Sequence, residues 1–395
     1  MDSERYWERR WLLPDGVDEL LPPEAARAEA LRRLLLDLYA AWGYELVMPP
    51  FIEYLDSLLT GTGRALDLQT FKITDQLSGR TMGVRADITP QAARIDAHQL
   101  RRAGVTRLCY IGSVFQARPE GPAGGRNPVQ LGAELYGHSG FESDTEVVCL
   151  MLETLRAAGV EHVHLDLGHV GIFRALAAEA GVSAETETAL FDALQRKAGD
   201  EVAAELERAG VTGRPAERLS ALTRLHGGVE VLDEAGDLLA GAGEPVAAAL
   251  RDLWAVASSL ERRDPGMPLH FDLGELRGYR YQTGVVFAAF VPGHGREVAR
   301  GGRYDGIGRA FGRHRPATGF SADLKSLLAL GTAPAPRDKA GIAAPWRDDI
   351  SLLKRVRQLR ALGERVVWQL PGDEEPHGCD RRLVERDGSW EVDAW

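Results

Sequence analysis

Two short stretches of the sequence carry charged side chains of the kind that hold a free amino acid. Asp87 and Thr89 stand just before Pro90, at an expected helix start, and Arg277 stands in a turn before an expected strand. The carboxylate of Asp87 can hold an ammonium group, and the guanidinium of Arg277 offers a forked donor for a carboxylate. Because a zwitterion needs opposite charges at its two ends, the pair predicts an amino-acid site. Taken alone, the first stretch can also be explained as a helix N-cap at Thr89, and the second as a surface turn at Arg277.

A strand with alternating side chains supplies polar groups for the side chain of such a ligand. Side chains two residues apart on a strand share a face, so Gln130, Gly132 and Glu134 lie together. A row of Gln and Glu is poor core material, and we expect the missing side chain at Gly132 to leave room for a small polar ligand. Tyr281, a few residues after Arg277, adds a phenol beside a ring. A solvent-facing sheet surface is the alternative explanation of the row.

Two glycine-rich segments raise the question of a phosphate site. Residues 60–64, TGTGR, could cradle an anion with backbone N–H groups, but they follow a helix-like run and are more typical of a helix C-terminal turn. Residues 301–306, GGRYDG, lead towards a helix that starts near Lys325 and Ser326. A nucleotide site is expected to aim a cation at a phosphate from this helix start, so the serine is unexpected there.

The bulk composition limits the classes of function. A chain of 395 residues is expected to form two or three domains with an ample core. The formal net charge of −11 argues against a broad nucleic-acid surface, because such surfaces are basic. Three cysteines without close spacing indicate a reducing compartment and no metal site. The charged N-terminal segment and the lack of a long apolar run predict a cytoplasmic protein that does not span a membrane.

Helices and strands alternate in the expected secondary structure. Apolar spacing and turn residues predict helices at 25–43, 90–103, 144–158 and 352–362, and strands at 44–48, 71–74, 81–85, 108–115, 130–136 and 365–369. Helical periodicity runs through residues 171–263, and strands resume at 269–273, 281–290 and 297–299. The dipeptide Asp387-Gly388 is typical of a two-residue hairpin turn. This order predicts an α+β fold with a mixed or antiparallel sheet.

The same pattern predicts four segments. The core comprises residues 1–170 and 264–330, and a helical insertion comprises residues 171–263. Residues 331–345, rich in Pro, Ala and Gly, are expected to form a linker. Residues 346–395 are expected to form a reduced α/β remnant, whose length is marginal for a free-standing domain.

In order along residues 10–330, these segments resemble the catalytic core of class II aminoacyl-tRNA synthetases, and specifically histidyl-tRNA synthetase. The stretches that carry the resemblance are Pro14-Asp15-Gly16, Met48-Pro49-Pro50-Phe51-Ile52-Glu53 (motif 1), Arg85-Ala86-Asp87-Ile88-Thr89, Phe115 to Glu134 (motif 2), Arg277 to Phe287, residues 301–306, and the region from Gly319 onward (motif 3). Each motif alone is unspecific, but their number and order are specific. The resemblance implies the class II synthetase fold and self-association as a homodimer through motif 1.

The positions that bind ATP in this family are altered. The synthetases open motif 2 with Phe-Arg-x-Glu, whereas this chain has Phe115-Gln116-Ala117-Arg118. Motif 3 of the synthetases ends in Glu-Arg, with the arginine on the γ-phosphate, whereas Lys325-Ser326 stand here. Adenylate formation depends on stabilising phosphate charge, and loss of one such donor typically costs about a hundredfold in rate. Gln116, Arg118 and Ser326 are therefore expected to mark a degenerate ATP site that supports little adenylation.

The amino-acid pocket matches the family far better. The resemblance implies these contacts with histidine: Asp87, Thr89 and Gln130 to the α-amino group, Glu134 to the imidazole, Arg277 to the carboxylate, and Tyr281 along the ring. Two positions depart from the family, since Asp87 replaces a longer glutamate and Gln282 stands where a second tyrosine is usual. The tail after residue 345 is shorter than the anticodon-binding domain of the synthetases and is acidic at 373–375, so no tRNA binding is expected.

A synthetase core that keeps its histidine pocket and loses its ATP site resembles the regulatory subunits of ATP phosphoribosyltransferase. The resemblance implies a non-catalytic subunit in a hetero-oligomer with the short-form catalytic subunit, which performs the first step of histidine biosynthesis. Histidine is the implied feedback effector, and neither a cofactor nor a catalytic residue of the chain's own is expected. A working histidyl-tRNA synthetase and a stand-alone histidine sensor are the alternatives, because a partner surface is not legible in one sequence.

Overall fold

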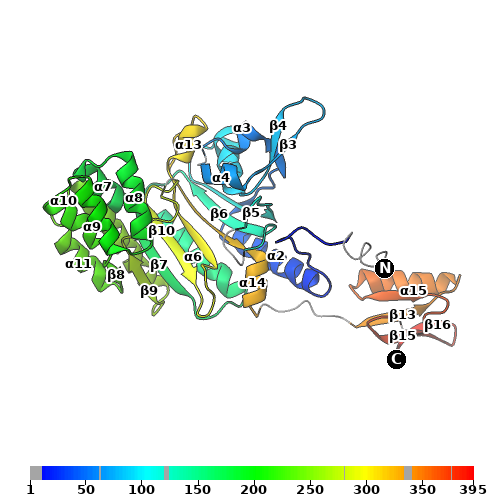
Figure 1. Cartoon of the computed structure of the whole chain (residues 1–395). Coiled ribbons are helices and arrows are strands. Elements are labelled where there is room, and N and C mark those ends of the chain that lie inside the picture. The colour runs from blue at the N-terminus through cyan, green and yellow to red at the C-terminus, as the bar shows by residue number, and fades with distance from the viewer. Residues whose placement is uncertain (1–10, 62–63, 120–123, 280, 333–339, 375) are drawn as a thin grey trace, which may run out of the picture. The chain divides into compact units, whose positions relative to one another are not determined.

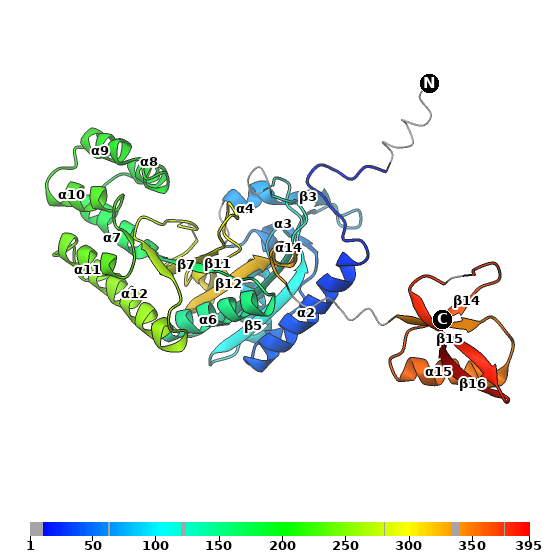
Figure 2. The same ribbon diagram turned by 90° about the horizontal axis from the view of Figure 1, so that it is seen from below.

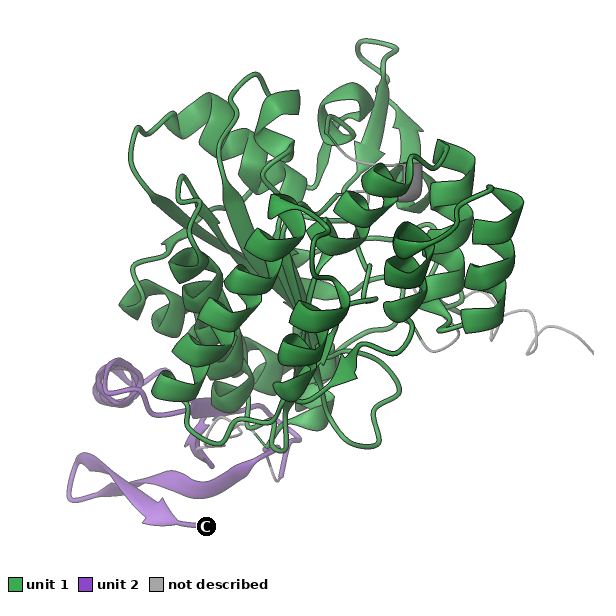
Figure 3. Ribbon diagram, turned by 90° about the vertical axis from the view of Figure 1, so that its left-hand side faces the viewer, with its two compact units in different colours: residues 1–334 green, residues 335–395 purple. Residues whose placement is uncertain are grey.

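The computed structural model consists of two compact units, which Figure 3 shows in green (residues 1–334) and purple (residues 335–395). The residues whose structure is described are 11–61, 64–119, 124–279, 281–332, 340–374 and 376–395. Within these ranges, no helix is both long enough and apolar enough to cross a membrane. Each unit has its own sheet and its own buried apolar cluster.

Nine strands form the main sheet of the larger unit, in the order β1-β5-β6-β12-β11-β10-β7-β9-β8. Their bounds are β1 Glu45–Leu46, β5 Thr106–Ser113, β6 Val129–Tyr136, β7 His164–His169, β8 His226–Gly227, β9 Leu269–Asp272, β10 Val285–Phe290, β11 Ala299–Arg303 and β12 Ala317–Asp323. Most neighbours are antiparallel, but β1 runs parallel to β5 and β7 runs parallel to β9. The mixed sheet confirms the predicted α+β fold.

Two strands begin or end four residues away from the predicted position. β11 starts at Ala299 and runs on to Arg303, because Gly301 and Gly302 pair with β12 on one side and with β10 on the other. β10 starts at Val285 rather than at residue 281, because the chain turns sharply before it. In that turn the backbone N–H groups of residues 281 and 282 both donate to the carbonyl oxygen of Gly278.

Helices pack against one face of the main sheet (Figure 2). They are α2 (Glu24–Ala41), α6 (Phe141–Ala157) and α14 (Leu324–Leu330). Leu35 and Tyr39 on the inner side of α2 are fully buried, and the Tyr39 ring meets the Phe320 ring of β12 edge-on. Since Phe320 alternates with Gly319 and Ser321 along β12, those two residues belong to the opposite face of the sheet.

A second, three-stranded sheet is formed by the chain between β1 and β5 of the main sheet. It has the order β2-β4-β3, and its strands are β2 Ile52–Tyr54, β3 Phe71–Thr74 and β4 Thr81–Val84. The predicted pairing of strands at 71–74 and 81–85 is confirmed, with Thr74 opposite Thr81. The short helices around this sheet are α3 (Leu55–Leu58) and α4 (Arg64–Gln69). Within the glycine-rich stretch 60–64, residues 62 and 63 lie outside the described residues.

The helix that carries Thr89 is shorter than predicted. It comprises α5 (Thr89–Arg94) and a turn of the wider π-helix, η1 (Ile95–Leu100). It ends because Arg101 adopts a left-handed conformation with φ of 49°, the usual geometry just beyond a helix C-terminus. A short helix, α13 (Ile307–Ala310), packs against α5.

Between β7 and β9 the chain forms a cluster of helices, green at the left of Figure 1. They are α7 (Val170–Ala180), α8 (Ala184–Gln195), α9 (Gly199–Arg208), α10 (Arg214–Ala221), α11 (Glu230–Leu238) and α12 (Glu244–Arg263). Their inner sides bury Leu194, Leu219 and Leu253 completely. The two-residue strand β8 pairs with β9 and so ties this cluster to the main sheet.

The smaller unit is a four-stranded sheet with one helix. Its elements are β13 (Gly341–Pro345), α15 (Ile350–Ala361), β14 (Val366–Gln369), β15 (Cys379–Arg386) and β16 (Ser389–Ala394), with strand order β14-β13-β15-β16. The hairpin prediction at Asp387-Gly388 is confirmed, since both residues have positive φ, 48° and 77°, as this turn requires. The linker prediction for 331–345 is wrong at its end, because residues 341–345 pair as the central strand β13; residues 333–339 lie outside the described residues.

Candidate functional site

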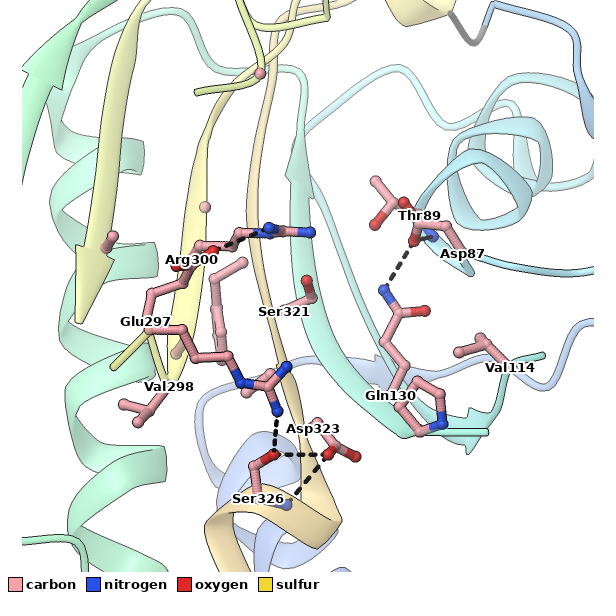
Figure 4. Close-up of a pocket in the computed structure, with 18 of the residues that line it drawn as sticks. Asp87, Thr89, Val114, Gln130, Glu297, Val298, Arg300, Ser321, Asp323 and Ser326 are labelled. Carbon is pink, nitrogen blue, oxygen red and sulfur yellow. Dashed lines mark hydrogen bonds and ion pairs between the residues drawn. The ribbon is translucent and has the colours of Figure 1, made fainter. Parts of the chain in front are cut away.

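A cavity of about 940 Å³ lies against strands β6, β12 and β11 (Figure 4). This volume is within the roughly 300–1,000 Å³ of small-molecule sites. Its described lining includes the six residues predicted to hold histidine and two of the three positions predicted for the degenerate ATP site: Asp87, Thr89, Gln130, Glu134, Arg277, Tyr281, Gln116 and Ser326. Arg118, the third ATP-site position, is exposed and is not part of this lining. Which ligand enters the cavity stays a prediction.

The Glu134 end of the cavity, formed by Asp87, Thr89, Gln130, Glu134 and Tyr281, rests on a row of small residues. Across the sheet, Glu134 on β6 stands opposite Gly319 on β12, and Gly319 stands opposite Gly302 on β11. A Cβ atom at Gly319 would lie 1.6 Å from Oε2 of Glu134, so only glycine leaves space for this carboxyl group.

Gly132 has a different role from the predicted one. A Cβ atom at Gly132 would lie 2.5 Å from the hydroxyl oxygen of Tyr110, which stands opposite it on β5. The space above Gly132 therefore belongs to Tyr110 and not to a ligand. Through this gap the Tyr110 hydroxyl reaches Glu134 and donates a hydrogen bond to Oε1 at 2.9 Å.

Glu134 is a buried carboxyl group held by two tyrosines. Its side chain accepts hydrogen bonds from Tyr110 and from Tyr304, and the residue is 1% exposed. Burial raises the pKa of Glu134 to about 8, because a charged carboxylate is poorly solvated here. Sequence reasoning missed both tyrosines. Tyr304 lies inside the quoted segment GGRYDG, and Tyr110 becomes recognisable once the β5–β6 register is known.

The side chains of Asp87 and Gln130 form a hydrogen-bonded pair (Figure 4). Gln130 donates from Nε2 to Oδ1 of Asp87 at 2.8 Å, and its Oε1 accepts from the N–H of Ile88 at 2.8 Å. Oδ1 of Asp87 also accepts from the N–H of Thr89 at 2.9 Å, so the Asp87 carboxylate does the capping predicted for Thr89. The Thr89 hydroxyl instead lies 2.9 Å from the Tyr110 hydroxyl. Oδ2 of Asp87 accepts no hydrogen bond from a described residue.

Arg277 is flanked by acidic side chains. Its guanidinium lies 3.2 Å from Oε2 of Glu275 and 3.4 Å from Oε2 of Glu297, and 5.1 Å from the centre of the Phe290 ring. The Arg277 side chain is 40% exposed. A ligand carboxylate can therefore reach this arginine, but it has to compete with two carboxylates of the protein.

The Ser326 end of the cavity, formed by Asp18, Gln116, Asp323, Lys325 and Ser326, is held by internal bonds. Asp323 caps helix α14, and its Oδ2 accepts from the backbone N–H of Ser326 at 3.2 Å and from the hydroxyl at 2.8 Å. Nζ of Lys325 lies 2.6 Å from Oδ1 of Asp18, so the cation expected to face a phosphate is already paired. Gln116 is buried and pairs through an isolated bridge with Thr70.

Acidic groups dominate the described lining of the cavity. It contains seven carboxyl side chains and four basic ones: Asp18, Asp87, Glu134, Asp166, Glu275, Glu297 and Asp323 against Arg277, Arg296, Arg300 and Lys325. Such a lining repels a triphosphate and favours a ligand that carries a positive group. Elsewhere in the described ranges, no three His, Cys, Asp or Glu side chains converge as metal ligands.

Comparison with known families divides the chain as the two units do. Residues 16–327 match the family model described as histidyl-tRNA synthetase. Residues 339–393 match the model described as the C-terminal domain of the ATP phosphoribosyltransferase subunit HisZ. The family models thus cover both the synthetase-like core and the small C-terminal unit.

Solved structures share the fold. A structure from Bacillus halodurans, titled as an ATP phosphoribosyltransferase regulatory subunit/histidyl-tRNA synthetase, has a TM-score of 0.81 and 28% sequence identity, and the match covers 92% of this chain and 94% of that one. The histidyl-tRNA synthetase of a Nostoc species has a TM-score of 0.74 at 20% identity, covering 95% of this chain and 91% of that one. The synthetase-like fold predicted from the motifs is confirmed.

Curated relatives match along nearly the whole chain. The ATP phosphoribosyltransferase regulatory subunit of Alkalilimnicola ehrlichii is 62% identical over 391 residues, which covers 98% of each chain. That of Thioalkalivibrio sulfidiphilus is 60% identical over 378 residues, which covers 95% of this chain and 96% of the relative. At this level of identity and coverage, the chain belongs to the family of ATP phosphoribosyltransferase regulatory subunits.

Proposed function

We propose that the chain binds histidine in this cavity and makes an ATP phosphoribosyltransferase catalytic subunit responsive to it. The observation that carries the proposal is the difference between the two ends of the cavity. The Glu134 end presents groups suited to an amino acid, whereas at the Ser326 end Lys325 and the start of helix α14 are occupied by the protein's own carboxylates. A subunit built this way senses histidine without consuming ATP.

Each end of the ligand has a matching group. The α-ammonium group binds Oδ2 of Asp87, because Oδ1 is already saturated by Gln130 and the N–H of Thr89. The imidazole ring lies beside Glu134, where burial favours a group that can share a proton. The carboxylate reaches Arg277 and replaces one of the flanking glutamates.

The chain carries out no adenylation of its own. The positions that hold phosphate in the synthetases are Gln116, Arg118 and Ser326, none of which supplies the usual arginine to the cavity. Without such donors, phosphate charge in a transition state is left unstabilised. Catalysis of phosphoribosyl transfer therefore belongs to the partner subunit, as the name of the family suggests.

The subunit works in an assembly. Histidine that binds one state of a complex more tightly than another shifts the complex towards that state, and this differential affinity is the source of feedback inhibition. Self-association is supported by exposed apolar side chains in and beside β1 and β2: Leu46, Met48, Phe51, Ile52 and Tyr54. Both strands are at the edges of their sheets, where a second copy can cover them.

The test is an assay of phosphoribosyl-ATP formation with a short-form catalytic subunit from the same genome. We expect little activity from either chain alone, a rise on mixing, and a fall when histidine is added to the mixture. If mixing changes nothing, histidine-dependent ATP–pyrophosphate exchange by this chain decides for the synthetase alternative. The relatives' names and the C-terminal family match do not favour that alternative.

A further inference from the structure

Two polar atoms at the Glu134 end have no hydrogen-bond partner among the residues that the structure describes. The hydroxyl of Tyr281 and Oε1 of Gln282 are buried and make no hydrogen bond to any described residue. The neighbouring amide of Gln130 and the hydroxyls of Thr89 and Tyr110 already bond to other groups of the protein. Buried polar groups are nearly always hydrogen-bonded, and an unpaired one costs free energy. Since both residues line the cavity, a ligand can supply the missing partners.

The amide of Gln282 lies beside the carboxyl group of Glu134 above the sheet. A Cβ atom at Gly302 would lie 2.7 Å from Oε1 of Gln282, and one at Gly319 would lie 1.6 Å from Oε2 of Glu134. Gly302 and Gly319 are direct cross-strand partners, and such partners have Cα atoms about 5 Å apart with side chains on the same face. The amide oxygen and the carboxyl group therefore occupy neighbouring positions on the floor of the cavity.

The carboxyl group of Glu134 and the amide oxygen of Gln282 differ in their hydrogen-bonding capacity. Glu134 already accepts hydrogen bonds from two tyrosine hydroxyls, and its carboxyl group can gain or lose a proton as the pH changes. The amide oxygen of Gln282 can only accept a hydrogen bond, whatever the pH. An imidazole fits both groups, because its two nitrogens lie at different edges of a flat ring and at least one of them carries a hydrogen.

We propose that Gln282 determines the specificity of this pocket by accepting a hydrogen bond from a ring N–H of the bound imidazole. The inference rests on the proposed function, since it assumes that histidine enters this cavity. It adds that Gln282 selects the ring of the ligand, although this chain departs from the synthetase pattern at this residue. An aromatic ring without an N–H leaves Oε1 of Gln282 unpaired and binds weakly.

The experiment combines two protein forms with three ligands. Calorimetry measures the Kd of the full-length chain and of Gln282→Leu for histidine, thiazol-4-ylalanine and thiazol-5-ylalanine, in which sulfur replaces Nε2 and Nδ1, respectively. We expect Gln282→Leu to weaken histidine binding about tenfold, the value of one buried neutral hydrogen bond. Neither analogue carries a ring N–H, so the leucine substitution should cause no further loss of affinity for either of them.

Controls separate this inference from its premise. Gln195→Leu, at an exposed glutamine at the end of α8, should leave all three Kd values unchanged. Gln282→Glu keeps a hydrogen-bond acceptor at this position and should still bind histidine at pH 6. This variant tests the proposal even if Gln282→Leu folds poorly. Unchanged histidine affinity in Gln282→Leu, or equal losses for all ligands, overturns the assignment of Gln282. Absence of histidine binding by the unaltered chain overturns the proposed function instead.

Discussion

The two ends of the cavity use the same sheet but differ in how their charges are neutralised. At the Glu134 end, tyrosine hydroxyls and amides hold the carboxyl groups, and Oδ2 of Asp87 and Oε1 of Gln282 have no partner in the described part of the chain. At the Ser326 end, Asp18 pairs with Lys325 and Asp323 caps the helix. On the proposed function, internal pairing closes the Ser326 end to ATP while the sheet that supports the histidine site stays intact.

The largest expected effect concerns the proton of Glu134. Its pKa is raised in the folded chain, so folding takes up a proton and the stabilisation is complete below the ordinary pKa of 4.5 and lost as the pH rises to about 8. Glu134→Gln removes this dependence. The free energy of unfolding of the unaltered chain should fall relative to that of the variant by about 3 kcal/mol between pH 5.5 and 8. Urea unfolding across this range measures the difference.

Glu207→Gln, at an exposed acid of α9, is the matched control and should follow the unaltered chain at every pH. Parallel profiles for the unaltered chain and Glu134→Gln would show that Glu134 is charged in the folded state. The Glu134 end would then hold a charged carboxylate, as the ion-paired Ser326 end does, and the two ends would not differ in this respect.

The sequence predicted the local elements well where turn chemistry decides them. The 71–74 and 81–85 strand pair and the Asp387-Gly388 hairpin follow from alternation and from residues that tolerate positive φ. The end of the helix at Leu100 was beyond prediction, because Arg101 adopts a left-handed conformation without a glycine to signal it.

The sequence predicted which residues line the candidate site, but it did not predict the hydrogen bonds and ion pairs between them. Motif order placed Asp87, Gln130 and Glu134 together, and the cavity contains them. The bonds of Tyr110 to Glu134 and of Arg277 to Glu297 depend on strand register and on segments far apart in sequence. For the same reason the sequence alone predicts free space above Gly132, although the hydroxyl of Tyr110 fills it.

Asp87→Ala tests the Glu134 end with the next largest effect. It removes the partner of the ligand's ammonium group, and hydrogen bonds to charged groups imply a loss of about a hundredfold in histidine affinity. Calorimetry on the full-length chain gives the Kd. Asp200→Ala, at an exposed acid of α9, should bind histidine as before. Histidine affinity that survives Asp87→Ala would place the ligand elsewhere in the cavity.

Arg277→Ala should have a smaller effect, because Glu275 and Glu297 already offset the charge of this arginine. We expect histidine affinity to fall about tenfold, since an exposed, partly neutralised partner contributes less than a buried one. The inhibition curve of the mixed complex should shift to higher histidine concentration while co-elution of the two subunits is unchanged. If histidine inhibits the complex as strongly as before, Arg277 does not bind the carboxylate of the ligand.

The smallest expected effect comes from Ser326→Arg, which restores the synthetase residue at the other end of the cavity. An arginine at this position lies next to Asp323, whose carboxylate can neutralise its charge, and it replaces the hydroxyl that accepts a hydrogen bond from Arg296. Gln116 still leaves the other phosphate position without a cation. We expect no ATP binding in calorimetry and a change of less than about twofold in histidine affinity. Measurable ATP binding by this variant would mean that a single residue closed the Ser326 end, and that internal pairing had no part in it.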